Sequence, residues 1–518
     1  MHVKHKLIKP NTMQSRVYQE TILGQAIDKN LLCVLPTGLG KTPIAVLLAA
    51  HRLEKYPDSK ILVLAPTKPL TNQNCNMFKK FLEINQEEFQ VITGIIKPKE
   101  REELYKKKKL IFATPQTIAN DYKAGRISLK NFSLLVTDEA HHSIGKYSYP
   151  YVTKRYLKEA ENPRVLGLTA SPGATHEKIK EICNSLGIQA VEIRTERDAD
   201  VVPYVKEKEI EWVYVDLPES FKKIKQLLEE IYRKKVQGLI KWRLIHKKRA
   251  SKKQLLELQK SLIKEVGRGN RKAFAPMMLV VQAIKLEHAL GLLETQGLNV
   301  LNKYWKKLMA ETSKVTQRLI KNRNVSQAIF LTNDLLKSDC RHPKMGKLCS
   351  IVERQLNEKQ DSKIIIFANF RESVKEIVNV LKRIDNVKPI EFVGQRMGIT
   401  QKEQIKRLEE FRSGSYNVLV CTSIGEEGLD IPSMDIAIFY EPVPSEIRSI
   451  QRRGRVGRQK IGKIVVLIAR ETRDEAYKWS AYYKEKKMRK TLYGLKKEFK
   501  EEKNKKIQEN KQKNLKEF

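Results

Sequence analysis

Two short motifs in this chain combine residue types and a spacing that could do chemistry. The first is the loop Leu35-Pro-Thr-Gly-Leu-Gly-Lys-Thr42, and the second is Asp138-Glu-Ala-His141, about a hundred residues later. Gly38 and Gly40 reach positive φ angles cheaply, so the backbone can wrap closely around phosphate oxygens. Amide groups of the loop and of the helix behind it then point at the anion. The loop therefore predicts a nucleotide site.

Lys41 and Thr42 close this loop. We expect Lys41 to neutralise the β- and γ-phosphates and Thr42 to ligate Mg²⁺. Leu35 stands where the strict pattern has its first glycine, so the loop by itself is an imperfect match. The residues expected to contact the nucleotide here are Pro36, Thr37, Gly38, Leu39, Gly40, Lys41 and Thr42.

The acidic pair completes the first half of a site. Residues 132–137 form a short apolar run that predicts a buried parallel strand, with Asp138 and Glu139 at its carboxyl end. We expect Asp138 to hold Mg²⁺ together with Thr42. Glu139 is placed to orient or deprotonate the attacking water. An isolated acidic pair is more often a solvated strand end, but the phosphate loop upstream favours the catalytic interpretation.

An arginine-rich motif, Gln451-Arg-Arg-Gly-Arg-Val-Gly-Arg458, lies some three hundred residues further on. A solvated basic turn is the simpler interpretation. An arginine supplied by a facing domain, however, stabilises charge on a transferring phosphoryl group by roughly 10³ or more in rate. We therefore expect Arg455 and Arg458 to be catalytic and Gln451 to contact the γ-phosphate or the water. A site divided in this way needs domain closure for catalysis.

The bulk composition limits the class of protein. A chain of 518 residues with 41% hydrophobic content predicts two to four domains with packed cores. No apolar stretch approaches the roughly 20 residues of a membrane span, and the N-terminus carries no apolar signal region. We therefore expect an intracellular, cytoplasmic protein. Its six cysteines have no zinc-like spacing, and we expect them to be free thiols.

A net charge of +40 indicates a polyanionic partner, nucleic acid first and an anionic membrane second. The charge is concentrated: residues 203–340 hold 29 Lys/Arg against 14 Asp/Glu, and residues 232–272 hold 15 against 2.

Short apolar runs alternate with helical stretches in two parts of the chain. This pattern predicts an α/β protein with two doubly wound parallel-sheet lobes, at 1–202 and 341–492, and an all-helical basic insert at 203–340. Residues 493–518 are rich in Lys, Glu, Asn and Gln and predict a frayed charged helix or a linker.

Taken together, these motifs resemble those of the superfamily 2 helicases and translocases, which have two RecA-like lobes. Arg16, Tyr18 and Gln19 resemble the family's adenine-recognition element. Thr169-Ala-Ser171 resembles the motif that couples hydrolysis to strand separation, and the resemblance gives His141 a coupling role as well. The resemblance implies nucleic-acid contacts at Thr67, Lys68, Thr114, Pro115, Arg371 and Thr422, and nucleotide contacts at Gly428 and Asp430.

Within this superfamily the chain most resembles the archaeal Hef and eukaryotic FANCM branch, by Gly394-Gln395, Gln401-Lys-Glu-Gln404 and the helical insert. The resemblance implies an ATP- and Mg²⁺-dependent motor that unwinds or remodels branched DNA at forks and Holliday junctions. Full-length Hef carries an XPF-type nuclease after its helicase part, so the resemblance implies such a module as a partner outside residues 1–518. The sequence does not identify a sliding clamp or another repair partner. One alternative stays open, a double-stranded-RNA-directed motor of the RIG-I or Dicer type. A scaffold with a decayed motor is disfavoured, because the sequence keeps all the expected catalytic residues together: Lys41, Thr42, Asp138, Glu139, Arg455 and Arg458.

The basic insert has two interpretations of similar weight on composition alone. It is either a spacer with solvated lysines or an arm that grips duplex or junction DNA through phosphates. The position between two motor lobes favours the arm. Tyr232 and Trp242 could stack on bases, although aromatic residues on amphipathic helices are more often core. The expected DNA contacts are Lys234, Lys235, Arg243, Lys247, Lys248 and Arg249.

Overall fold

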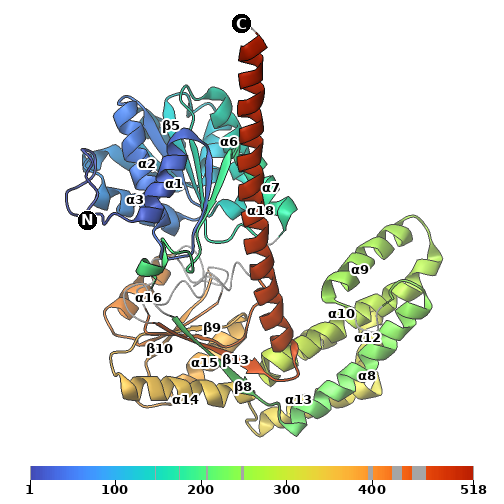
Figure 1. Cartoon of the computed structure of the whole chain (residues 1–518). Helices are drawn as coiled ribbons and strands as arrows, with labels where there is room; N and C mark the ends of the chain where they lie inside the picture. The colour runs from blue at the N-terminus through green and yellow to red at the C-terminus, as the bar shows by residue number, and fades with distance from the viewer. Residues whose placement is uncertain are drawn as a thin grey trace.

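The computed structural model describes residues 2–145, 147–173, 175–205, 208–246, 250–394, 401–422, 434–445 and 462–516. These residues form two α/β lobes, a helical arm beside the second lobe, and one long helix that runs back along the first lobe (Figure 1). Both sheets are parallel, so the predicted fold class is confirmed.

The first lobe is built on a parallel sheet whose described strands follow the order β3-β4-β2-β5-β6-β1-β7. Successive side chains of a strand point to opposite faces. In β1, Leu31 and Cys33 therefore join one core, which α1 to α3 cover, while Leu32 and Val34 join the other, which α5 to α7 cover. The strands are β1 (Leu31–Val34), β2 (Lys60–Leu64), β3 (Phe89–Ile92), β4 (Leu110–Ala113), β5 (Phe132–Asp138), β6 (Val165–Thr169) and β7 (Ala190–Ile193). The helices are α1 (Val17–Asp28), α2 (Lys41–Lys55), α3 (Lys68–Phe81), α4 (Pro98–Lys107), α5 (Pro115–Lys123), α6 (Ser148–Glu159) and α7 (His176–Leu186).

The second lobe has its own parallel sheet, in the order β10-β11-β9-β12-β13-β8. Helices α14 and α15 pack on one face of this sheet, and α16 packs on the other. The elements are β8 (Lys208–Val215), α14 (Pro343–Glu358), β9 (Ile364–Phe367), α15 (Arg371–Leu381), β10 (Pro389–Phe392), α16 (Gln401–Arg412), β11 (Val418–Cys421), β12 (Ile436–Phe439) and β13 (Gly462–Ala469).

Strand β8 corrects the expected start of the helical insert. It pairs in parallel with β13 along its whole length, from Lys208 opposite Gly462 to Val215 opposite Ala469. Residues 208–215 thus belong to the sheet of the second lobe, and the boundary expected at 202/203 is wrong for them. Charged residues occupy three of the first four positions of this edge strand, so only its second half is a continuous apolar run of the kind that indicates a buried parallel strand.

The helical insert contains α8 (Glu219–Lys241), α9 (Lys252–Gly267), α10 (Phe274–Thr295), α11 (Leu298–Met309), α12 (Lys314–Ile320) and α13 (Arg323–Lys337). Contrary to the sequence analysis, one stretch here, Arg271–Thr295, is long and apolar enough to cross a membrane by length and composition. Half of it is buried, and residues such as Val280, Leu286 and Leu290 form the core of the insert with α8 and α11. Its composition therefore fits the central helix of a bundle.

Helix α18 (Arg473–Lys516) is continuous and corrects the last predicted boundary. A frayed charged helix or a linker was predicted from residue 493. The segment is helical, but it does not begin a separate tail. Instead, Leu492 and Leu495 are buried in the core of the first lobe together with Met488, and Phe499 packs against the same core. These apolar residues are separated by many charged residues, so the sequence does not show a clear apolar pattern here. Figure 1 shows α18 extending from the second sheet along the side of the first lobe.

Candidate active site

The phosphate loop joins β1 to α2, and its two glycines adopt left-handed backbone angles. Gly38 has φ +91°, and Gly40, which caps the N-terminus of α2, has φ +78°. A Cβ on Gly40 would lie 2.4 Å from Gln19 Nε2, so any other residue here would displace the Gln19 side-chain amide. Leu35 is fully buried and has no positive φ, so the residue that departs from the strict pattern serves as core rather than as part of the turn. The Lys41 ammonium donates to the Leu35 carbonyl oxygen at 3.1 Å.

Residues just before and within α1 hold the outer side of the loop. Gln19 Nε2 donates to the Gly40 carbonyl oxygen at 3.2 Å, and the Tyr18 hydroxyl donates to the Leu39 carbonyl oxygen at 2.6 Å. Arg16 donates to the Tyr18 hydroxyl at 3.0 Å, and its guanidinium lies 5.2 Å from the centre of the Tyr204 ring. The predicted adenine-recognition residues therefore lie against the phosphate loop. Tyr204 is an addition that the sequence analysis missed.

Asp138 ends β5 and is held by two donors. Its Oδ2 accepts from the Asn74 side-chain amide at 3.0 Å, and its Oδ1 accepts from the Glu139 backbone N–H at 3.0 Å. Burial, followed by the nearby Glu139 charge, raises the pKa of Asp138 to about 6, while Asn74 and the Lys41 ammonium act to lower it. Lys41 and Asp138, a hundred residues apart in sequence, thus act on each other electrostatically.

Glu139 has a left-handed backbone with φ +49°, which is uncommon for a residue other than glycine. Such conformations cluster at functional sites. Here the turn directs the chain from β5 into the short helix Ala140–His142. His141 Nδ1 then lies 3.3 Å from the Glu139 carboxylate and 3.1 Å from the Thr169 hydroxyl.

Thr169 extends this connection to Ser171. The Ser171 backbone N–H donates to the Thr169 hydroxyl at 3.2 Å, and the Ser171 hydroxyl donates to the Met488 sulfur at 3.0 Å. The three residues expected to couple hydrolysis to movement, His141, Thr169 and Ser171, therefore form one contiguous chain that starts at Glu139. Met488 is a further residue that no motif indicated.

Oxygen donors at this edge suit Mg²⁺, which prefers carboxylate and hydroxyl ligands and usually keeps water or phosphate in the remaining positions. Asp138 supplies the carboxylate, and Thr42 begins α2 beside Lys41. Among the described residues, no group of three or more His, Cys, Asp or Glu side chains could hold a metal ion by itself. The donor set thus fits a Mg²⁺ that shares its coordination with a nucleotide.

The predicted strand-contacting residues lie at the carboxyl ends of the two sheets. Thr67 and Thr114 cap the N-termini of α3 and α5, after β2 and β4, and are followed by Lys68 and Pro115. In the second lobe, Arg371 begins α15 after β9 and donates to the Gly394 carbonyl oxygen at 2.8 Å. Thr422 follows β11 directly. Open α/β sheets bind their ligands at this edge.

The described basic residues of the insert differ in their exposure to solvent and in their contacts. Lys234 is exposed and pairs with Glu230 at 2.6 Å, while partial burial lowers the pKa of Lys235. Arg243 is exposed and lies two residues after the end of α8, with φ +55°. Tyr232 is core and donates its hydroxyl to the Ala250 carbonyl oxygen, whereas Trp242 is 47% exposed. Several predicted site residues lie outside the described residues: Lys247, Lys248, Arg249, Gly428, Asp430, Gln451, Arg455 and Arg458.

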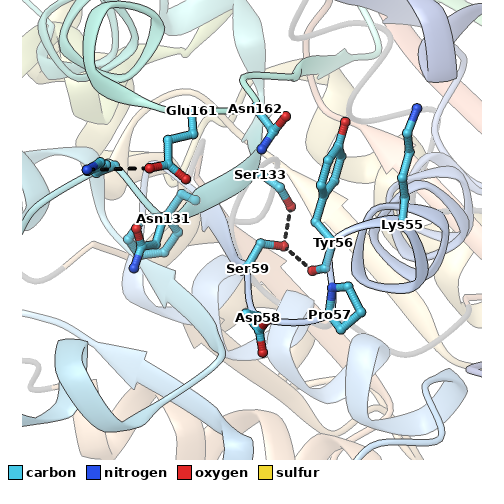
Figure 2. A pocket seen from close by; sticks show the side chains of 11 residues that line it. Lys55, Tyr56, Pro57, Asp58, Ser59, Asn131, Ser133, Glu161 and Asn162 are labelled. Carbon is cyan, nitrogen blue, oxygen red and sulfur yellow. Dashed lines mark hydrogen bonds and ion pairs between the residues drawn. The ribbon is translucent and has the colours of Figure 1, made fainter.

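A well-formed pocket of about 380 Å³ lies elsewhere in the first lobe, and Figure 2 shows the residues that line it. It is found where β2 and β5 begin, at the opposite end of these strands from Asp138. Ser59 bonds to the Ser133 hydroxyl and to the Tyr56 carbonyl oxygen, both at 2.7 Å. We assign no chemistry to this pocket, because these polar groups satisfy one another and none of the predicted site residues lines it.

Comparisons with known proteins agree with this geometry. Residues 7–174 match the family described as "Type III restriction enzyme, res subunit". Residues 343–460 match "Helicase conserved C-terminal domain", and residues 220–339 match "Putative ATP-dependent RNA helicase, helical bundle". These matches cover both lobes and the arm, and they define an ATP-hydrolysing helicase.

The crystal structure of the Pyrococcus furiosus Hef helicase domain is similar, with a TM-score of 0.72 and 46% identity, over 92% of this chain and 100% of that one. The chain belongs to the superfamily 2 helicases, on the branch that contains Hef and the FANCM proteins.

Curated relatives extend the similarity to longer proteins. A "Putative ATP-dependent RNA helicase" of Methanocaldococcus jannaschii is 44% identical over 96% of this chain and 63% of its own length. The "ATP-dependent DNA helicase fml1" of Schizosaccharomyces pombe is 34% identical over 91% of this chain and 59% of that protein. The "ATP-dependent DNA helicase MPH1" of Pyricularia oryzae is 33% identical over 89% of this chain and 44% of its own length. The chain thus spans less than two thirds of the length of each of these relatives.

Proposed function

We propose that this helicase uses Mg²⁺ and ATP to move along DNA and to unwind or remodel branched structures such as forks and Holliday junctions. The observation that carries the proposal is the position of four residues at the carboxyl edges of the two sheets. Thr67 and Thr114 lie on the same edge of the first sheet as Lys41 and Asp138, and Arg371 and Thr422 lie on the carboxyl edge of the second sheet. Closure of the lobes would therefore move the strand contacts of one lobe relative to those of the other.

ATP with its Mg²⁺ supplies the phosphoryl group whose transfer to water drives this motion. In our proposal Lys41 neutralises the phosphates, Thr42 and Asp138 hold the metal, and Glu139 orients the water. Arg16 and Gln19 recognise the base. Arg455 and Arg458 stabilise the charge that develops during transfer, and Gln451 contacts the γ-phosphate or the water. Gly428 and Asp430 complete the nucleotide contacts from the second lobe.

The preference for DNA draws on the named DNA helicases among the relatives and on the resemblance to Hef. An RNA-directed motor is the alternative, and one observation favours it: the relative from M. jannaschii and the matched helical segment both carry the name of an RNA helicase. Comparing the stimulation of ATP turnover by forked DNA and by double-stranded RNA separates the two. Stronger stimulation by RNA would overturn our proposal.

The basic insert is the part we propose to grip duplex DNA. Phosphate contacts from lysine and arginine give binding that is independent of sequence and steeply dependent on salt, which suits an enzyme that recognises structure. A motor of this kind works inside the cell, bound to DNA. The resemblance to Hef also implies an XPF-type nuclease in the same protein, and our proposal for this chain covers the motor alone.

A further inference from the structure

Helix α18 contacts all three parts of the molecule. Its first residues lie at the second lobe and the insert, and its middle packs on the first lobe (Figure 1). Arg473 pairs with Glu287 at 2.8 Å and with Glu294 at 2.9 Å, and both carboxylates belong to α10 of the insert. Asp474 forms a fully buried ion pair with Lys344 of α14. The beginning of α18 is thus fastened to the insert and to the second lobe by charged contacts.

The middle of α18 is fastened to the first lobe by an apolar stripe. Met488, Leu492 and Leu495 are spaced at helical intervals and are buried in one core of the first lobe, where α18 packs on α7 and β7. Polar contacts flank the stripe: Lys496 pairs with Glu192 at 2.9 Å. This end of the helix therefore follows the first lobe when that lobe moves.

One turn of α18, between its contacts with the insert and its apolar contacts with the first lobe, touches both lobes. Lys484 donates to the Pro444 carbonyl oxygen of the second lobe at 2.6 Å. Four residues later, on the same face of the helix, Met488 accepts the Ser171 hydroxyl at 3.0 Å. Pro444 lies seven residues before Gln451, the start of the arginine-rich motif. A single helical turn therefore touches the segment that leads to that motif and the Thr169-Ala-Ser171 motif of the facing lobe.

We propose that Met488 is a positioning residue for ATP-driven movement and acts through Ser171. The Ser171 hydroxyl is buried, and its backbone N–H bonds to Thr169, which bonds to His141 beside Glu139. When these hydrogen-bonded residues shift during hydrolysis, the Ser171 hydroxyl moves against Met488. Because α18 is a continuous helix, the shift is passed to the Arg473 and Asp474 contacts and so to the insert. The energy of hydrolysis at Glu139 reaches the DNA-gripping arm by this route.

A purely structural role for the stripe makes a different prediction. In that case any apolar residue of the right volume would serve at position 488. The thioether differs from a leucine side chain in accepting a hydrogen bond, although weakly. Met488→Leu keeps volume and polarity within the range that cores tolerate, yet it leaves the Ser171 hydroxyl without this acceptor. Leu495→Met is the matched control, since it makes the reverse exchange in the same core, two turns away.

The test measures strands separated per ATP hydrolysed on a forked DNA duplex, together with the melting temperature of each variant. Met488→Leu should lower this ratio by roughly twofold to threefold, which is the effect of losing a hydrogen bond to a weak acceptor. Its melting temperature should stay close to that of the wild type. Leu495→Met should leave the ratio unchanged. A wild-type ratio in Met488→Leu, or an equal loss in both variants, would overturn the inference.

A double-mutant cycle with Ser171→Ala adds a readout that packing alone does not move. If Met488 acts through Ser171, the double variant should be no worse than the poorer single variant. Losses that multiply would contradict the inference. This inference rests on the helicase activity, but its failure can be told from that of the DNA proposal. If the wild type does not open forked DNA, the DNA proposal fails. The separation of double-stranded RNA per ATP hydrolysed then replaces the opening of forked DNA as the readout in the same variants.

Discussion

The Asn74 side-chain amide donates a hydrogen bond to the Asp138 carboxylate at 3.0 Å, although 64 residues separate the two in sequence. Asn74 is buried on α3, the helix that Thr67 caps. A proposed strand-contacting element and a proposed Mg²⁺ ligand are thus joined through one helix. If nucleic acid binds at Thr67 as we propose, movement of α3 would reach Asp138 through this hydrogen bond and change the rate of hydrolysis.

Asn74→Ala should therefore weaken the link between nucleic acid and hydrolysis. A hydrogen bond to a charged group contributes about 1.5–3 kcal/mol, so stimulated ATP turnover should fall by roughly tenfold or more. Asn76→Ala, an exposed position on the same helix, is the matched control. Steady-state turnover with and without DNA makes the measurement. Equal rates in the two variants would argue against the link.

Lys41→Ala and Asp138→Asn should each abolish ATP hydrolysis and leave DNA binding largely intact. Both side chains act on the nucleotide in our proposal, while the DNA contacts are carried by other residues. An ATPase assay checks the loss of hydrolysis, and fluorescence anisotropy with labelled DNA checks that binding is retained. Undiminished DNA-stimulated hydrolysis in Lys41→Ala would refute the assignment of the site.

Gly40→Ala should impair nucleotide binding. A left-handed backbone costs an alanine roughly 1–2 kcal/mol, and the new Cβ would also displace the Gln19 amide, 2.4 Å away. We expect the KM for ATP to rise by about tenfold. Gly125→Ala is the control, since Gly125 has φ +69° but open space around it. The Gly125→Ala variant should lose a little stability and keep its KM for ATP. An equal rise of the KM in both variants would mean that backbone strain, and not the displaced Gln19 amide, causes the effect.

Neutralising the insert should weaken DNA binding and flatten its salt dependence. For each phosphate that the variant no longer neutralises, the slope of log K against log salt should become shallower by about 0.9. Lys234→Gln, Lys235→Gln and Arg243→Gln combined are the test. Lys106→Gln and Lys107→Gln on α4 remove exposed lysines from the first lobe and serve as the control. Unchanged affinity and slope in the insert variant would restore the spacer interpretation.

Lys344→Met should destabilise the protein strongly, because it leaves the Asp474 carboxylate buried without its partner. Removing one member of a buried pair costs roughly 3–5 kcal/mol. Lys106→Met, which breaks the exposed pair with Glu102, should cost less than about 1 kcal/mol. Denaturant unfolding measures both. A similar small loss in the two variants would show that the Lys344 pair does little to hold α18.

The sequence by itself determined the features that depend on local residue type. Gly38 and Gly40 mark the turn because few other residues adopt its angles, and both lobes have the parallel sheets that the alternation of apolar runs and helices predicts. The order of the motifs along the chain was sufficient for the family and the fold class. The imperfect position, Leu35, proved to be core.

Tertiary structure decided what depends on distant partners. Strand β8 joins the second sheet because β13, some 250 residues later, offers it an edge. Asn74 and Met488 belong to no motif, and their importance comes from Asp138 and Ser171, which the fold brings beside them. The apolar stripe of α18 is diluted by surrounding charges in the sequence. Only packing against the first lobe reveals it, since burial is a property of the whole fold rather than of a segment.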